Sequence, residues 1–181
     1  TAFEAYVTGD ASWTAQLTRI AQSRPDVLFL PNYHDEVPGQ ARQARALGIT
    51  ATLLGGDGWE MLSGPGLEAL DGSFFSSTWA PEMQAPGSRE FVAAYTAAYQ
   101  REPNSTACLA YDAVLLAAEA LARAQDSGPE ALRQALSEVE VLDGAGGVYR
   151  YRGGGDPEKS AAILRVADGR AVFYKEMTPG Q

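Results

Sequence analysis

The chain has 181 residues, of which 45% are hydrophobic and 20% are charged. This balance fits one ordinary globular domain or two small lobes and is unlike that of a disordered polymer. The formal net charge of -9 argues against nucleic acid or an anionic membrane as a partner, because both favour clusters of lysine and arginine.

The chain contains a single cysteine, Cys108, and a single histidine, His34. A lone cysteine cannot form an internal disulfide, and the apolar neighbours of Cys108 favour a small buried thiol. A lone histidine leaves no His/Cys cluster for zinc or iron and no histidine pair for base catalysis. We therefore expect no metal, no cofactor and no catalytic site. No apolar run approaches the roughly 20 residues of a bilayer-spanning helix.

Short β-prone runs alternate with amphipathic helical stretches in the first 54 residues. We expect strands at 3–7, 26–30 and 51–54, and helices at 13–22 and 36–47. This alternation predicts an α/β fold with a parallel sheet covered by helices. The run 26–30 is apolar after its first residue, as expected of a central strand that is buried on both faces.

A glycine loop with the sequence GGDGW follows the predicted strand 51–54. Glycines on both sides of Asp57 let a ligand approach the backbone closely. Because the carboxyl ends of parallel strands meet at one edge, we expect the Asp57 loop and the Asn32-Tyr33 loop to share a crevice. In the alternative interpretation, Asp57 bonds its own backbone or caps the next helix.

The second half of the chain has a different character. A β-prone run, 73–79, leads into a turn-rich segment, 80–87, which is our candidate crossing between two lobes. We expect helices at 89–100, 107–124 and 128–138, and strands at 147–151, 161–166 and 171–174. Helical spacing places Tyr99 and Leu121 in the core. Asp168-Gly169 predicts a hairpin turn between the last two strands.

Six strings carry a resemblance to a known family. They are PDVLFLPNY at 25–33, QARQARALG at 40–48, GGDGW at 55–59, FVAAY at 91–95, AYDAV at 110–114 and DPEKSAAIL at 156–164. In order and spacing, the chain resembles the branched-chain amino-acid-binding proteins of ABC transporters along almost its whole length. The resemblance implies a type I periplasmic-binding-protein-like fold, in which two α/β lobes close on a small ligand.

The resemblance also implies an incomplete protein, the C-terminal half of such a binder. Residues 1–77 and 161–181 would form part of the second ligand-binding lobe, and 78–160 would supply helices and an edge strand of the first. Most of the first lobe's sheet and the opening β-α unit of the second would be missing. We therefore expect association with the missing N-terminal half or with a second copy of this chain.

Four ligand-binding residues follow from the resemblance. Asp57 takes the position of an acidic residue that binds the α-ammonium group, and Tyr33 that of a tyrosine that walls the ligand. Gly58 matches a position where the backbone passes close to the ligand. Trp59 follows the motif and would either close over an apolar side chain or anchor the next helix. The alternative for Tyr33 is that it only packs beside Asp57.

The implied function is that of a solute-binding component of an ABC importer, not an enzyme. It would capture a small amino acid, branched-chain or otherwise apolar, for an ABC permease. The location would be periplasmic or extracytoplasmic, with a lipid anchor in a single-membrane bacterium. An alternative from another class is a ligand-sensing regulator or receptor module of the same fold that binds an amide or small acid.

Overall fold

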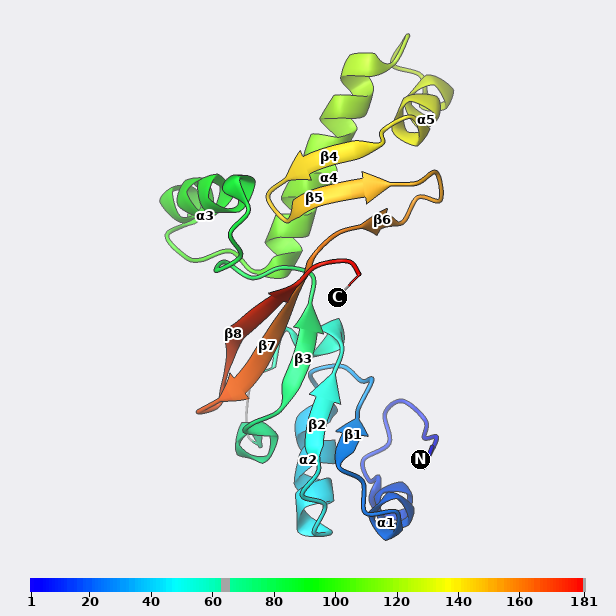
Figure 1. Cartoon of the computed structure of the whole chain (residues 1–181), viewed down its shortest axis with the longest axis vertical. Helices are drawn as coiled ribbons and strands as arrows, with labels where there is room; N and C mark the ends of the chain where they lie inside the picture. Colours follow the sequence, from blue (N-terminus) through cyan, green and yellow to red (C-terminus); the bar gives the residue numbers. More distant parts are fainter. Residues whose placement is uncertain (63–65, 181) are drawn as a thin grey trace. The chain divides into compact units, whose positions relative to one another are not determined.

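The computed structural model describes residues 1–62 and 66–180. The chain forms two compact units and passes between them three times (Figure 1). Unit 1 comprises Thr1–Ser77 and Ile163–Lys175, and unit 2 comprises Thr78–Ala162 and Glu176–Gln181. Which lobe of a complete binding protein each unit represents stays a prediction.

The centre of unit 1 is a five-stranded sheet with the order β1-β2-β3-β7-β8. Its strands are β1 (Val27–Phe29), β2 (Thr52–Gly55), β3 (Phe74–Ser77), β7 (Ala161–Ala167) and β8 (Arg170–Met177). The helical elements are α1 (Thr14–Gln22), α2 (Val37–Ala46) and two short 3-10 turns, η1 (Asp57–Trp59) and η2 (Leu67–Leu70). Strands β1, β2 and β3 are parallel neighbours, as predicted.

Strands β7 and β8 are joined by Asp168 and Gly169, whose φ angles are 50° and 70°. Two successive residues with positive φ form the turn that tight hairpins favour. The predicted hairpin is therefore confirmed, and it makes the sheet mixed instead of wholly parallel.

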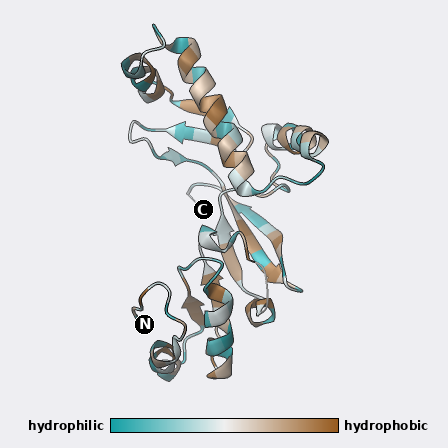
Figure 2. Cartoon of the chain, turned by 180° about the vertical axis from the view of Figure 1, so that it is seen from behind, coloured by the Kyte–Doolittle hydropathy of each residue, from teal (hydrophilic) through white to brown (hydrophobic). Residues whose placement is uncertain are grey.

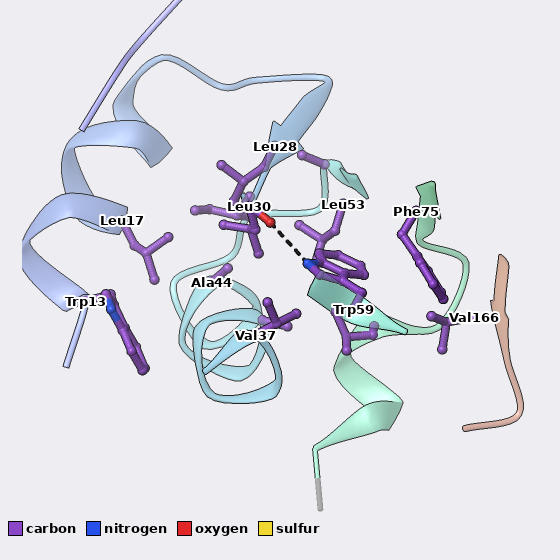
Figure 3. Close-up of a cluster of buried hydrophobic side chains, with 14 residues drawn as sticks. Trp13, Leu17, Leu28, Leu30, Val37, Ala44, Leu53, Trp59, Phe75 and Val166 are labelled. Atoms are coloured by element: carbon purple, nitrogen blue, oxygen red, sulfur yellow. Dashed lines mark hydrogen bonds between the residues drawn. The ribbon is translucent and has the colours of Figure 1, made fainter. Parts of the chain in front are cut away.

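The core of unit 1 is apolar. Side chains from α1, α2 and one face of the sheet point toward one another (Figure 3). Leu28 is buried in this core, whereas its neighbours Val27 and Phe29 are exposed on the other face. The expectation that this strand is central and buried on both faces is wrong, because β1 is an edge strand with one covered face.

Residues 3–7 do not form the expected strand. A strand needs a neighbour for its backbone hydrogen bonds, and no strand within the described ranges pairs with this segment. Phe3 and Val7 are exposed. The segment is tied down instead by the Tyr6 hydroxyl, which is hydrogen-bonded to the side chains of Asn32 and Glu36.

Unit 2 combines three helices with a small antiparallel sheet. The elements are α3 (Pro86–Tyr99), α4 (Ser105–Arg123), α5 (Pro129–Ser137), β4 (Val141–Gly144), β5 (Gly147–Tyr151) and β6 (Pro157–Glu158). A proline in the first turn starts both α3 and α5. Asn104 caps α4 by accepting a hydrogen bond from the Ala107 amide at 2.9 Å. The three helices were predicted from the sequence, whereas β4 and β6 were not.

A buried carboxylate holds the centre of unit 2. Asp112, in the middle of α4, is 3% exposed. It accepts hydrogen bonds from the amides of Ala145 (2.6 Å) and Gly146 (2.7 Å) and from the Tyr149 hydroxyl (2.6 Å). A Cβ added at Gly144 would lie 2.6 Å from an Asp112 oxygen, so glycine is required there. These bonds join α4 to the β4–β5 hairpin.

Helix α4 is long and apolar enough to span a membrane, judged by length and composition alone. The expectation that no such run exists is therefore wrong. Its hydrophobic positions are visible in Figure 2, and Val114 is 68% exposed. Tyr99 and Leu121, both expected in the core, are also exposed. That expectation fails because the described elements of unit 2 leave much of the surface of α3 and α4 uncovered.

Candidate ligand-binding site

The loops after β1 and β2 lie beside each other at the carboxyl ends of these strands. The His34 amide donates a hydrogen bond to the Gly58 carbonyl at 2.8 Å. A Cβ added at Gly58 would lie 2.7 Å from the Asn32 carbonyl oxygen, so the approach requires glycine. The predicted adjacency of the Tyr33 and Asp57 loops is confirmed, and a crevice shared by the two loops stays a prediction.

Trp59 lies in the core beneath this site. Its side chain is 0% exposed, and its Nε1 donates to the Leu30 carbonyl at 3.1 Å (Figure 3). A Cβ added at Gly55 would lie 2.1 Å from the indole, so Gly55 makes room for it. Of the two roles considered for Trp59, this geometry supports the anchor, because the buried indole has no surface with which to cover a ligand.

A second anchor fixes the loop from the other side. Ser77, the last residue of β3, donates to Glu60 directly after η1 at 2.5 Å. The turn that carries Asp57 is thus attached through Trp59 to Leu30, directly after β1, and through Glu60 to β3. Sequence reasoning missed Glu60, because its partner is 17 residues away and only the adjacency of β2 and β3 brings the two together.

Asp57 and Tyr33 present their side chains to solvent. The Asp57 residue is exposed, and its carboxylate has no hydrogen bond or ion pair within residues 1–62 and 66–180. No side-chain cap bond forms at the start of η1. The alternative in which Asp57 caps the next helix is therefore absent from this structure. Tyr33 is 71% exposed, so a carboxylate and a phenol are both available to a ligand on adjacent loops.

Buried polar side chains hold the loop that carries Tyr33. The Asn32 side chain donates to Gln40 and accepts from Tyr6. Glu36 accepts a hydrogen bond from the Gly9 amide at 2.7 Å. One signal for this role is visible in the sequence, a polar residue that follows the apolar run of β1 and Pro31. The partners of Asn32 come from other elements and could not be read from the local pattern.

An apolar cavity of about 850 Å³ lies along the free edge of β1. It is lined by residues 1–6, by Trp13, Gln16, Leu17 and Ile20, and by residues 23–32 and Gln40. The backbone groups of Asp26 and Leu30 are hydrogen-bonded to β2. Because these groups alternate in direction along a strand, Val27 and Phe29 turn their N–H and C=O groups toward the cavity.

Among the residues that the structure describes, no group of three or more His, Cys, Asp and Glu side chains could hold a metal ion. The Asp57 carboxylate and the Tyr33 hydroxyl offer charge pairing and hydrogen bonding at the two loops. An exposed carboxylate beside close-packed backbone suits a ligand that carries an ammonium group.

Comparisons with known proteins identify the family. Residues 2–171 match the family described as periplasmic binding protein. A Leu/Ile/Val-binding protein of Rhizobium johnstonii is 30% identical over 169 residues, which are 93% of this chain and 38% of that protein.

Solved structures agree with this match. The leucine-binding protein of Thermotoga maritima has a TM-score of 0.85 and 30% identity, over 96% of this chain and 51% of that one. A branched-chain amino acid transporter substrate-binding protein of Streptococcus pneumoniae, solved with isoleucine, has a TM-score of 0.78 and 26% identity, over 96% and 51%. The chain spans about half the length of these structures.

The fold expected from the sequence, that of a type I periplasmic binding protein, is confirmed by these similarities. Membership of this family implies a periplasmic or extracytoplasmic location. The relatives are solute-binding proteins for amino acids. Since the match extends over residues 2–171, the chain belongs to the periplasmic binding protein family.

Proposed function

We propose that this chain is the ligand-closing half of the substrate-binding component of an ABC importer. It captures a small amino acid with a branched-chain or other apolar side chain and does no chemistry on it. The observation that carries this proposal is the unpartnered carboxylate of Asp57, fixed beside the Tyr33 loop. The relatives named for leucine and the structure with isoleucine support the ligand class. The partner is an ABC permease, and a lipid anchor holds the protein in a single-membrane bacterium.

Asp57 accepts hydrogen bonds from the α-ammonium group of the amino acid. Such charge-assisted bonds gain strength when a closing cleft removes water and lowers the local dielectric constant. Gly58 has no side chain to keep the ligand from the backbone. Tyr33 lays its ring against the ligand, and its hydroxyl is available as a donor. Trp59 supports the loop from the core.

Replacing Asp57 with Asn tests the proposal by calorimetric titration of L-leucine into the polypeptide that carries both lobes. The loss of a charged hydrogen bond is expected to weaken leucine binding by roughly 10- to 100-fold. The matched control is Asp35→Asn, which removes an exposed carboxylate from the neighbouring loop and leaves the affinity unchanged. Unchanged affinity in Asp57→Asn would contradict the assignment.

The ligand itself offers a second test. 4-Methylpentanoate has the carbon skeleton and carboxylate of leucine but no ammonium group. Wild-type protein is expected to bind it much more weakly than leucine, and Asp57→Asn is expected to lose most of that preference. Tight binding of an amide or acid without an ammonium group, unaffected by Asp57→Asn, would favour the ligand-sensing module instead.

The missing N-terminal half is the proposed occupant of the cavity beside β1. A strand from that half would pair with the backbone groups of Val27 and Phe29 and fill the space between β1 and residues 1–6. The solved relatives are about twice as long as this chain, which supports a complementary segment of this size. The uncovered side of α4 offers a second apolar surface to the same half.

Native mass spectrometry of the chain mixed with the separately produced N-terminal half measures this association. Val27→Pro removes an amide that faces the cavity and leaves the pairing of β1 with β2 unchanged. A one-to-one complex that Val27→Pro weakens is expected, while the exposed control Thr50→Pro is not expected to change it. A homodimer of this chain that excludes the N-terminal half would overturn the proposal.

A further inference from the structure

Three short segments carry the chain between the units, at Ser77-Thr78, Ala162-Ile163 and Lys175-Glu176. Lys159 lies just before the second of them, in unit 2. Its Nζ donates to the Thr78 carbonyl at 2.5 Å and to the Ser160 carbonyl at 3.0 Å. One ammonium group therefore binds the backbone of the first passage, 81 residues away, and the backbone leading into the second.

The third passage reaches the same cavity as Lys159. Glu176 is its first residue in unit 2 and lines the same cavity of about 520 Å³ as Lys159. Burial lowers the pKa of Lys159, whereas the nearby carboxylates of Asp112 and Glu176 favour the charged form. The Nζ atom also lies 5.3 Å from the centre of the Tyr149 ring, at cation–π distance.

Lysine suits this position for a physical reason. Its ammonium group is a compact point charge with three donors that can turn toward separate acceptors. The carbonyl groups of Thr78 and Ser160 and the ring of Tyr149 all lie close to it. The planar fork of arginine matches a single carboxylate better than such a dispersed set of acceptors.

We propose that Lys159 is a positioning residue that fastens the first and second interunit passages to each other on the unit 2 side and thereby limits the motion between the units. All its contacts lie within unit 2, so it acts on these two passages and not on a ligand. The inference goes beyond the proposed function, because it holds whichever ligand the protein binds.

Spin-label distance measurements test this inference without any ligand. Labels at Ala46→Cys on α2 and Ala122→Cys on α4, in a Cys108→Ala background, report the distribution of distances between the units. Lys159→Met is expected to broaden this distribution about twofold, because the first and second passages lose the donor that they share. The matched control is Arg152→Met, which removes an exposed cation that pairs with Glu158 and leaves the width unchanged.

Hydrogen exchange of unit 2 accompanies each measurement and shows whether the variant is folded. If Lys159→Met unfolds unit 2, Lys159→Gln is measured in the same way, because its amide keeps a donor with a shorter reach. Broadening in a folded Lys159 variant, absent from Arg152→Met, supports the proposal. An unchanged width in a folded Lys159 variant, or equal broadening in the control, overturns it. Neither outcome depends on amino acid binding, so the proposed function is tested separately.

Discussion

Both units bury apolar side chains, in unit 2 among them Trp79, Met83 and Phe91, but the groups at their centres differ. Unit 1 is centred on an apolar cluster that includes two tryptophans, Trp13 and Trp59. Unit 2 is centred on the carboxylate of Asp112, which binds two backbone amides and a tyrosine hydroxyl. Apolar packing is tolerant of volume-conserving change, whereas a buried charge is stable only while all its partners remain. Unit 1 is also the unit that carries the exposed Asp57 and Tyr33.

The centre of each unit also holds in place the functional residues that the unit carries. Trp59 serves both the core and the Asp57 loop, so packing energy in unit 1 directly fixes the candidate site. In unit 2, Asp112 secures the hairpin that contains Tyr149, and Tyr149 in turn contacts Lys159. The polar centre of unit 2 thus supports the residue that we propose to control the passages.

The largest effect is expected from Asp112→Ala. Two amides and one hydroxyl would lose their acceptor in a buried place, which is expected to cost about 3–5 kcal/mol. Hydrogen exchange should show that unit 2 loses protection while unit 1 keeps it. The exposed control Asp143→Ala, on the adjoining strand β4, should change neither unit. An equal loss of hydrogen-exchange protection in both units would contradict the proposed difference between them.

A smaller but clear effect is expected from Trp59→Leu in unit 1. The substitution leaves a cavity and removes the bond to Leu30, at an expected cost of about 2–4 kcal/mol. Here unit 1 should lose protection and unit 2 should keep it. Met61→Ala, two residues away but exposed, should stay within about 0.5 kcal/mol. Retained protection in Trp59→Leu would show that the apolar cluster does not depend on this indole.

The smallest effect concerns alkaline pH. Burial, and secondarily Asp112, raise the pKa of the Cys108 thiol from 9.0 to about 12. The unfolded chain therefore releases this proton first, and the thiol's contribution to stability, complete below pH 9, declines as the pH rises toward 12. Tyr149 also lowers the stability at alkaline pH, because burial raises the pKa of its hydroxyl in the folded chain as well.

Urea unfolding at several pH values, monitored by hydrogen exchange, measures this decline in the stability of unit 2. In Cys108→Ala the loss of stability between pH 9 and 12 should be less steep than in the wild-type chain. An identical slope of stability against pH in both proteins would mean that the Cys108 thiol does not contribute to this pH dependence. Slow alkylation of Cys108 in the folded chain at pH 8 would be consistent with its burial.

Local sequence patterns predicted most elements of the fold. Helical periodicity located α1 to α5, and the Asp168-Gly169 pair located the hairpin, because both signals depend on neighbouring residues. Predictions that depended on distant partners failed. Residues 3–7 have β propensity but no neighbouring strand, and the apolar run of β1 is an edge instead of a centre. Short strands such as β4 and β6 were missed because turn residues surround them.

The sequence by itself determined the family, the alternation of strands and helices, and the position of Asp57 after a strand. Glycine spacing and hydrophobic periodicity depend on neighbouring residues only, so they can be recognised without knowledge of the fold. Only the tertiary structure decided that Trp59 is buried in the core, that Glu60 and Asn32 hold the loops of the candidate site, and that Asp112 and Lys159 hydrogen-bond distant segments of unit 2. These contacts join residues far apart in the chain, and their energies depend on burial and geometry that no local pattern records.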